Sequence, residues 1–302
     1  MLTHQFPNAQ QPARVVILGA GGFLASELER VLERANIATR PVYPREIDLT
    51  DAAAADRVAA LLEPQDAVIM PAGLTPDKGR DIATLMKNLR MGECVCAALA
   101  RSSVAHFVYV SSDGVYDGRF SSLLNEDSST EPTDLYTLMH IARELMLGQT
   151  CRERKIPFMV VRPAAIYGPG DTHNSYGPNR FVRTACQDGK ITLFGGGEEK
   201  RHHVFVGDVA KILKCGVLRR STGVINAATG EAISFRDLAA VVTAAAGREV
   251  ALECLPRANP ITHRHFDTAA LARAFPEFAA TPLVTGIART VAGVVGSRVG
   301  VA

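Results

Sequence analysis

The sequence predicts an α/β protein with a doubly wound parallel sheet and a smaller C-terminal lobe. Over residues 13–168, short apolar runs alternate with segments whose apolar residues recur at helical spacing. Parallel strands joined by crossover helices produce this pattern. After residue 168, glycine and proline divide the chain into short elements. The 302 residues are 47% hydrophobic, so the chain can bury a sizeable core.

The first lobe opens with an apolar run at 14–18 and a helical pattern at 23–34, separated by a glycine-rich turn. Each later apolar run is short and bounded by turn residues, as expected for buried strands. Further strands are expected at 38–43, 67–70, 106–110 and 158–161, and further helices at 52–62, 82–100 and 135–149.

The two ends of the chain differ from this pattern. Residues 1–12 contain glutamine, asparagine and two prolines, which predicts a flexible tail. Residues 203–224 have the pattern of a strand and a helix that return to the first lobe. A helix is expected over 234–247, opened by Ser234 as its cap. The smaller lobe therefore consists of 169–202 and 225–302.

Charge and hydropathy exclude several classes of partner. Lys plus Arg number 33 and Asp plus Glu number 31, so the net charge of +2 gives no general attraction to nucleic acid or to an acidic membrane. No stretch reaches the ~20 apolar residues of a membrane span, and the N-terminus lacks a signal pattern. A cytoplasmic location is expected. His202 and His203 have no further ligand at metal-binding spacing, so no metal is expected.

A glycine-rich turn lies between the first strand and the first helix. It reads Gly19-Ala-Gly-Gly22, followed by Ala25 at the position of a third small residue. Glycines here allow a pyrophosphate to approach backbone N–H groups at a helix N-terminus. An ordinary turn is the alternative, but the strand–turn–helix order predicts a Rossmann-type dinucleotide site. The dinucleotide-binding domain is therefore 13–168, with 203–224 returning to it.

The end of the second strand bears on the choice of cofactor. The chain reads Arg40-Pro-Val-Tyr-Pro-Arg45, where a carboxylate would bind the ribose hydroxyls of NAD. Arginine suits a 2′-phosphate, so NADP is preferred over NAD, unless these arginines are simply solvated. Asp48 is placed to accept a hydrogen bond from the adenine amino group, or alternatively to cap the helix that follows.

Several motifs recur along the chain in a fixed order. Besides the glycine turn they are Lys87–Gly92, Val110–Tyr116, Arg162–Pro169, Gly195–Asp208 and Asn226–Glu231. In this order they resemble the extended short-chain dehydrogenase/reductase family, which comprises NAD(P)-dependent nucleotide-sugar epimerases, dehydratases and reductases. The resemblance spans nearly the whole chain.

The resemblance implies a proton-transfer site. In this family a tyrosine exchanges a proton with a sugar hydroxyl or carbonyl, a serine or threonine binds the same oxygen, and a lysine lowers the tyrosine pKa. By position Tyr136 is the acid/base, and Ser112 is the serine, with Ser111 as the alternative. The physical requirement is general acid–base catalysis by a group whose ordinary pKa is about 10.

His140 stands where the family has lysine. The i, i+4 spacing places Tyr136 and His140 on one helical face. A histidine has an unperturbed pKa near 6.5 and is mostly neutral at pH 7, so it would lower the tyrosine pKa much less. It could hydrogen-bond the nicotinamide ribose. The alternative is a packed or solvated helix histidine in a protein that has lost the chemistry.

Asp113 narrows the reaction type. Family members that dehydrate a sugar carry an Asp after the hydroxyl residue, followed by a Glu, whereas Gly114 follows here. This disfavours a full dehydratase and resembles the sugar-nucleotide 4-ketoreductases. A turn carboxylate with no part in catalysis is the alternative for Asp113.

The resemblance also implies the remaining site residues and partners. It implies a nucleotide-diphosphate sugar as substrate and a homodimer formed through the helices at 82–100 and 135–149. The activity is then an oxidoreductase or epimerase of cell-surface polysaccharide or glycoside biosynthesis, and the alternative is a catalytically silent NAD(P)-binding sensor or scaffold. The substrate-binding residues are Asn174, Arg180, Phe194 and Arg201. The cofactor-binding residues are Gly19, Gly22, Phe23, Leu24, Arg45, Asp48, Leu49, Pro71, Ala72, Gly73, Asn88, Tyr136, His140 and Pro163.

Overall fold

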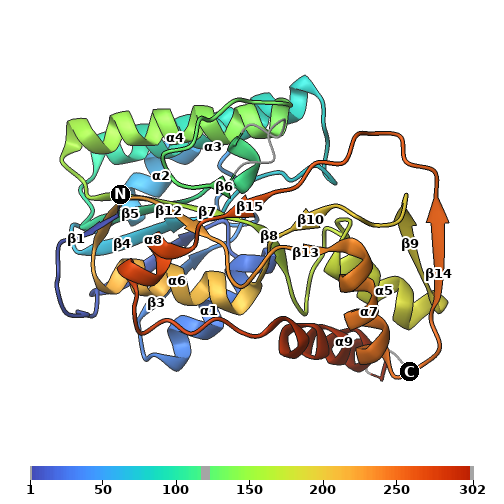
Figure 1. Ribbon diagram of the computed structural model, residues 1–302. Coiled ribbons are helices and arrows are strands. Elements are labelled where there is room, and N and C mark those ends of the chain that lie inside the picture. Colours follow the sequence, from blue (N-terminus) through green and yellow to red (C-terminus); the bar gives the residue numbers. More distant parts are fainter. Residues whose placement is uncertain (1, 117–122, 300–302) are drawn as a thin grey trace.

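In the computed structural model a seven-stranded sheet forms the centre of the first lobe (Figure 1). The structure describes residues 2–116 and 123–299. Met1 and residues 300–302, the extreme ends of the expected tail and second lobe, lie outside them. The strand order is β1-β12-β7-β5-β4-β2-β3. The strands are β1 (Thr3–His4), β2 (Arg14–Leu18), β3 (Thr39–Val42), β4 (Asp66–Met70), β5 (His106–Val110), β7 (Phe158–Pro163) and β12 (Ser221–Ala227).

All pairs in this sheet are parallel except the one that β1 makes with β12. The chain winds outward from β2 in both directions, to β3 on one side and to β4 on the other. In such sheets ligands bind at the carboxyl ends of the strands, where the winding direction reverses. The predicted doubly wound parallel sheet is therefore confirmed.

Helices cover both faces of the sheet (Figure 1). α1 (Phe23–Arg34) and α6 (Val206–Leu218) lie together on one face, and α2 (Ala54–Leu61), α3 (Ile82–Arg101) and α4 (Leu135–Arg154) on the other. Side chains of β2 alternate between the two layers: Ile17 joins the core under α1, and Val16 joins the core under α3. Each expected element of the first lobe is present, with ends shifted by a few residues.

The second lobe consists of short elements, as expected. The main elements of this lobe are α5 (Pro178–Asp188), β9 (Lys190–Phe194), α7 (Phe235–Ala246), β14 (Ala251–Leu255) and α9 (Leu283–Val299). Ser234 caps α7, because its hydroxyl accepts a hydrogen bond from the Asp237 N–H at 3.0 Å. Two short strand pairs lie near the boundary between the lobes. β8 (Ala165–Tyr167) pairs with β11 (His203–Phe205), where the chain leaves and re-enters the first lobe, and β10 (Lys200–Arg201) pairs with β13 (Ile233–Ser234) within the second.

The N-terminal residues correct the expectation of a flexible tail. Thr3 and His4 form β1 on the edge of the sheet, opposite Thr222 and Ser221. The His4 ring also hydrogen-bonds the Ser221 hydroxyl and the Ala274 carbonyl, each at 2.8 Å. The composition of residues 1–12 could not predict this pairing. The hydrogen-bond partners are backbone groups at the otherwise free edge of β12, which lies more than 200 residues further along the chain.

The C-terminal lobe is also less continuous than the sequence indicates. β12 continues to Ala227, past the expected boundary at residue 224. Further along, β15 (His265–Phe266) pairs with β6 (Leu123–Leu124), and α8 (Ala269–Ala274) packs against β12. Residues 265–274 therefore lie on the first lobe, although they belong to the range 225–302 assigned to the second.

The described residues contain neither a membrane-spanning helix nor a metal-binding cluster. Within residues 2–116 and 123–299, no helix is long and apolar enough to cross a membrane. The same residues contain no group of three or more histidine, cysteine or carboxylate side chains placed to hold a metal ion. His202 instead accepts a hydrogen bond from the Phe266 N–H at 3.2 Å.

Three buried histidines predict acid sensitivity of the fold. Burial lowers the pKa of His106 to about 4 and that of His140 and His203 to about 3. The unfolded chain protonates them below its pKa of about 6.5, so their stabilising effect is complete above that pH and is lost as pH falls toward 4 and 3. For each of these histidines, the free energy of unfolding is expected to be about 1.4 kcal/mol lower at pH 5.5 than at pH 7.5.

Urea unfolding at pH 7.5 and pH 5.5 measures this loss. His140→Gln should reduce the pH dependence, whereas His263→Gln, a change in a loop of the second lobe, should leave it unchanged. Equal unfolding free energies of the parent protein at both pH values would contradict the prediction.

Candidate functional site

A cleft of ≈ 1340 Å³ follows the carboxyl ends of the strands and extends to the second lobe. Most residues that the sequence singles out line it. They are Gly19, Gly22, Phe23, Leu24, Arg45, Asp48, Leu49, Pro71, Ala72, Gly73, Ser112, Asp113, Tyr136, His140, Pro163, Asn174 and Arg180. Three others, Asn88, Phe194 and Arg201, do not line it.

The glycine turn between β2 and α1 fits a pyrophosphate. Gly19 has φ +98°, and a Cβ there would lie 2.6 Å from the Cβ of Ala72, so only glycine allows this close approach of two loops. Gly22 precedes α1 and has no side chain to cap it, and the next four residues, Phe-Leu-Ala-Ser, carry no carboxylate. The first N–H groups of α1 are thus available to an anionic ligand.

The two arginines after β3 have different environments. Arg40 pairs with Glu46 through both nitrogens of its fork and also donates to the Pro41 carbonyl. Arg45 is exposed at the cleft, with its guanidinium 5.1 Å from the centre of the Tyr43 ring. No carboxylate among the described residues forms an ion pair with Arg45, so this is the arginine able to receive a phosphate.

Asp48 also lines the cleft, but its carboxylate has local partners. It accepts hydrogen bonds from the N–H of Thr50 at 2.9 Å and from the Thr50 hydroxyl at 2.8 Å. These bonds lower the pKa of Asp48. The geometry is that of a turn closed by its own side chain, and one carboxylate oxygen remains for a ligand.

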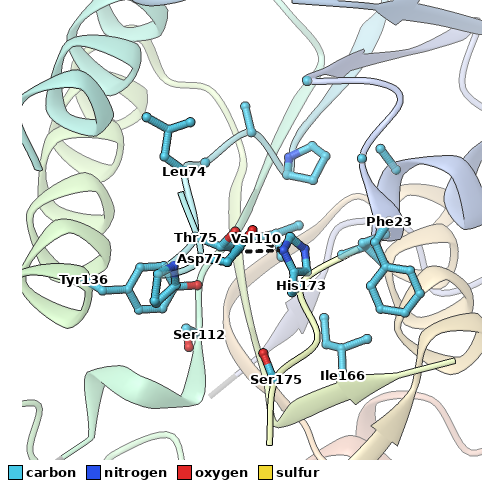
Figure 2. Close-up of a pocket in the computed structure, with 18 of the residues that line it drawn as sticks. Phe23, Leu74, Thr75, Asp77, Val110, Ser112, Tyr136, Ile166, His173 and Ser175 are labelled. Carbon is cyan, nitrogen blue, oxygen red and sulfur yellow. Dashed lines mark hydrogen bonds and ion pairs between the residues drawn. The ribbon is translucent and has the colours of Figure 1, made fainter. Parts of the chain in front are cut away.

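The start of α4 positions Tyr136. Asp134 caps the helix by accepting a hydrogen bond from the Thr137 N–H, and the Thr137 hydroxyl accepts in return from the Asp134 N–H. This capping box fixes the first turn, and Tyr136 extends from it into the cleft beside Ser112 (Figure 2).

Ser112 rather than Ser111 is the hydroxyl near Tyr136. The Ser111 hydroxyl donates to Glu144 at 2.5 Å and is committed to that carboxylate. The Ser112 Oγ accepts from the Gly114 N–H at 3.0 Å, which orients it while leaving its proton available. Burial raises the pKa of Tyr136 well above its usual value, with Tyr109 and Asp113 adding to the rise, while Arg143 and the hydrogen bond with Ser112 lower it.

His140 is neutral and has one nitrogen available. Its Nδ1 lies 2.8 Å from the hydroxyl of Tyr109, and its Nε2 is buried with no hydrogen-bond partner among the described residues. Burial, followed by the charge of Arg143, lowers the pKa of His140 to about 3. The ring lies 4.7 Å from the Tyr136 ring and perpendicular to it. His140 therefore cannot supply the positive charge of a lysine.

Asp113 interacts with an arginine that sequence reasoning missed. Arg264 donates to the Asp113 carbonyl at 3.1 Å and approaches its Oδ2 at 3.4 Å. Burial raises the pKa of the Asp113 carboxyl, and the charge of Arg264 opposes the rise. Arg264 lies 151 positions further along the chain, in a loop without periodicity, so no sequence signal connects the two.

Three expected site residues have other roles. The side-chain amide of Asn88 accepts a hydrogen bond from the Leu74 N–H at 2.8 Å and donates one to the Leu74 carbonyl at 3.0 Å. Asn88 therefore stabilises the loop after β4. Arg201 is held by the carbonyl and hydroxyl of Thr262. The Phe194 ring packs 5.2 Å from Tyr176, outside the cleft. In this arrangement the three side chains contact other parts of the protein and do not line the cleft.

A polar bridge crosses the cleft and was not anticipated. The Thr75 hydroxyl donates to Asp77 at 2.6 Å, and the Nδ1 of His173 lies 3.0 Å from Thr75 and 3.1 Å from Asp77 (Figure 2). Burial tends to raise the pKa of Asp77, but hydrogen bonds from its neighbours outweigh it and lower that pKa to about 2. The bridge joins the loop after β4 to the loop after β8, two irregular segments that no sequence pattern relates.

Comparisons with known proteins agree with this fold. Residues 15–228 match the model of the NAD dependent epimerase/dehydratase family. The dTDP-D-glucose 4,6-dehydratase of Mus musculus is 27% identical over 114 residues, which is 38% of this chain and 32% of that protein. The Homo sapiens protein of the same name is 27% identical over 115 residues, 38% of this chain and 33% of its own. The aligned part is thus about a third of these relatives.

Solved structures share nearly the whole fold. The UDP-glucose 4-epimerase of Thermus thermophilus, in complex with NAD, has a TM-score of 0.83 at 20% identity, covering 94% of this chain and 99% of its own. The GDP-L-fucose synthetase of Naegleria fowleri, bound to NADP, has a TM-score of 0.84 at 18% identity, covering 99% and 98%. The family model, the parallel sheet and the glycine turn agree, and the chain belongs to the NAD-dependent epimerase/dehydratase family of extended short-chain dehydrogenase/reductases.

Proposed function

We propose that this protein is an NAD(P)-dependent nucleotide-sugar oxidoreductase or epimerase in which Tyr136 is the acid/base. The observation that carries the proposal is a single cleft lined by the glycine turn at one end and by Tyr136, Ser112 and Asp113 at the other. A dinucleotide bound along it would supply or accept the hydride. Solved relatives in complex with NADP, or with NAD and UDP-glucuronic acid, support the same substrate class.

Side chains of the protein would bind the sugar oxygen and transfer a proton to it. Ser112 and Tyr136 bind one sugar oxygen, and Tyr136 donates its phenolic proton to that oxygen as a ketone becomes an alcohol. Burial keeps Tyr136 protonated near neutral pH, because it raises the pKa of the phenol. A protonated acid favours the reductive direction, so we propose reduction of a 4-keto sugar as the preferred reaction.

Arg45 supports NADP as the preferred cofactor. Its exposed guanidinium at the cleft would bind a 2′-phosphate by charge-assisted hydrogen bonds. Arg45→Ala is expected to weaken NADP binding by about tenfold to a hundredfold and to leave NAD binding unchanged. Isothermal titration with both cofactors measures this, with Arg34→Ala, an exposed arginine outside the cleft, as control. Equal weakening of NADP and NAD would remove the argument for NADP.

The remaining expectations are proposals about setting and assembly. We place the protein in the cytoplasm, in synthesis of cell-surface polysaccharide or of glycosides, and as a homodimer. The helices α3 and α4 pack together and expose large apolar side chains, which supports a dimer through them. These side chains are Ile82, Met86, Leu138 and Leu145.

Turnover of a panel of UDP-, dTDP- and GDP-sugars, including 4-keto forms, tests the proposed function. Each is incubated with NADP(H) and with NAD(H), and products are identified by NMR. Product formed by the parent protein identifies the reaction type and the nucleotide together. Cofactor binding without product on any member of the panel would reject the enzyme.

A catalytically silent NAD(P)-binding sensor or scaffold is the second candidate. One observation favours it: His140 is neutral, so the position of the family lysine carries no charge to assist Tyr136. This candidate predicts tight cofactor binding, no turnover, and the same cofactor affinity after Tyr136→Phe.

A further inference from the structure

The site contains a buried cation one turn beyond His140. Arg143 is fully buried on α4. Its Nε donates to the Asn88 carbonyl at 2.8 Å, one Nη donates to the same carbonyl at 2.5 Å, and the other donates to the Ala72 carbonyl at 2.7 Å. Within the described part of the chain, no carboxylate lies at ion-pair distance from Arg143.

A buried charge without an ionic partner is costly. Removing a guanidinium from water costs several kcal/mol, and carbonyl dipoles offset this only in part. The carbonyls of Asn88 and Ala72 need hydrogen-bond donors, but dipoles of this kind do not need a full positive charge. Arg143 shares a helical face with His140 at i, i+3 and with Tyr136 at i, i+7.

Tyr109 is close to His140 and within the field of Arg143. Burial raises the pKa of Tyr109 to about 12, and the charge of Arg143 opposes the rise. The protonated Tyr109 hydroxyl can donate to the Nδ1 of His140, 2.8 Å away. The Nε2 of His140 then carries the ring proton. It is the buried nitrogen without a partner in the described residues.

We propose that Arg143 is a positioning residue which, across Tyr109 and His140, supplies the positive potential that a lysine at position 140 would supply to Tyr136. This inference rests on the proposed function of Tyr136. Arg143 itself touches neither substrate nor cofactor, because it lies behind Ala72 and Gly73, outside the cleft. The neutral His140 adds no charge of its own, and the charge remains on Arg143.

Few charged or titratable groups surround Tyr136, and each can be assigned an effect on the ionisation of its phenol. Tyr109 of β5 and Asp113 of the short helix after it disfavour the phenolate, and Arg143 favours it. Arg264 and Arg201 act on Asp113. Two further groups matter less: Lys87 of α3 lines the cleft from an exposed position, and Glu144 of α4 is neutralised by Arg162.

Titration of Tyr136 itself tests the proposal without any substrate. 3-Fluorotyrosine at position 136, observed by 19F NMR with bound NAD⁺, reports ionisation of that one phenol. Arg143→Met is expected to raise the phenol pKa by about one pH unit. Arg143→Lys keeps the charge and should change it by much less, although it loses part of the hydrogen bonding.

Relocating the charge distinguishes electrostatics from packing. In the Arg143→Met background, His140→Lys should return the phenol pKa toward the parent value, whereas a purely structural role of Arg143 would not be rescued. If Arg143→Met does not fold, Arg143→Gln keeps hydrogen-bond donors without the charge and should still raise the phenol pKa. An unchanged phenol pKa in these variants, or an equal rise in Arg143→Lys and Arg143→Met, would overturn the proposal.

The titration also separates this proposal from the proposed function. A protein that turns over no sugar nucleotide but shows the expected phenol shifts keeps Arg143 in this role and rejects only the reaction. Turnover of a sugar nucleotide with no phenol shift in the variants keeps the reaction and rejects Arg143. Where activity is found, Arg143→Met should also move the pH–rate profile to higher pH.

Discussion

Tyr136→Phe is expected to lower kcat for the sugar nucleotide by about 10³-fold while the cofactor dissociation constant stays within a factor of about two. The change removes one oxygen and keeps the ring that packs at 4.7 Å against His140. Without the phenolic proton, the start of α4 has no hydroxyl free to donate to the sugar oxygen, because the Thr137 hydroxyl is bonded to the backbone of Asp134. Steady-state kinetics and cofactor titration measure the two effects separately.

The matched control is Tyr176→Phe, another tyrosine that lines the cleft. Its ring packs between Phe181 and Phe235, and its hydroxyl makes only a long contact of 3.4 Å with the Phe194 N–H. It should keep kcat within a few-fold of the parent. Retention of most activity in Tyr136→Phe would show that the acid/base lies elsewhere, and Asp113 would be the next residue to change.

Glu144→Ala is expected to lower the free energy of unfolding by about 3–5 kcal/mol. Arg162 donates to the two Glu144 oxygens at 3.0 Å and 2.6 Å, and both side chains are almost entirely buried. Removing Glu144 leaves a buried guanidinium without its partner and also takes the acceptor from the Ser111 hydroxyl. Urea unfolding at pH 7.5 measures the loss.

Two further variants serve as controls. Glu153 lies on the same helix, is exposed and forms a side-chain hydrogen bond with Gln149, so Glu153→Ala should change the free energy of unfolding by no more than about 0.5 kcal/mol. The double change Glu144→Gln with Arg162→Met removes both charges and should destabilise less than Glu144→Ala alone. A loss below about 1 kcal/mol in Glu144→Ala would mean that water reaches Arg162.

The fold of the first lobe could be predicted because its pattern is local. Each strand of the sheet is a short apolar run, each helix has its own apolar face, and glycine marks the turn before α1. The pairing of β1 with β12, and of β15 with β6, joins segments 219 and 142 positions apart, counting from Thr3 to Thr222 and from Leu123 to His265. Two-residue strands carry no periodicity, so composition alone misassigned the first of them to a tail.

The candidate site divides in the same way. Residues fixed by a strand end or a helix start, such as Gly19 and Tyr136, lie where their motifs predict. Arg201 and Phe194 precede or follow glycine-rich turns whose path depends on distant loops, and both lie outside the cleft. Arg143 was missed for another reason: its spacing from Tyr136 was available in the sequence, but burial of its charge becomes visible only in three dimensions.

The edges of the central sheet determine how the molecule resists aggregation. At one edge β3 contains Pro41, which has no N–H to offer an incoming strand. At the other edge the chain covers β12 with its own residues, because β1 and the N–H groups of Gln5 and Phe6 bond to positions 219–222. Loss of the first six residues would uncover these groups and give a second molecule a template for strand addition. The N-terminal segment thus shields the outer edge of β12.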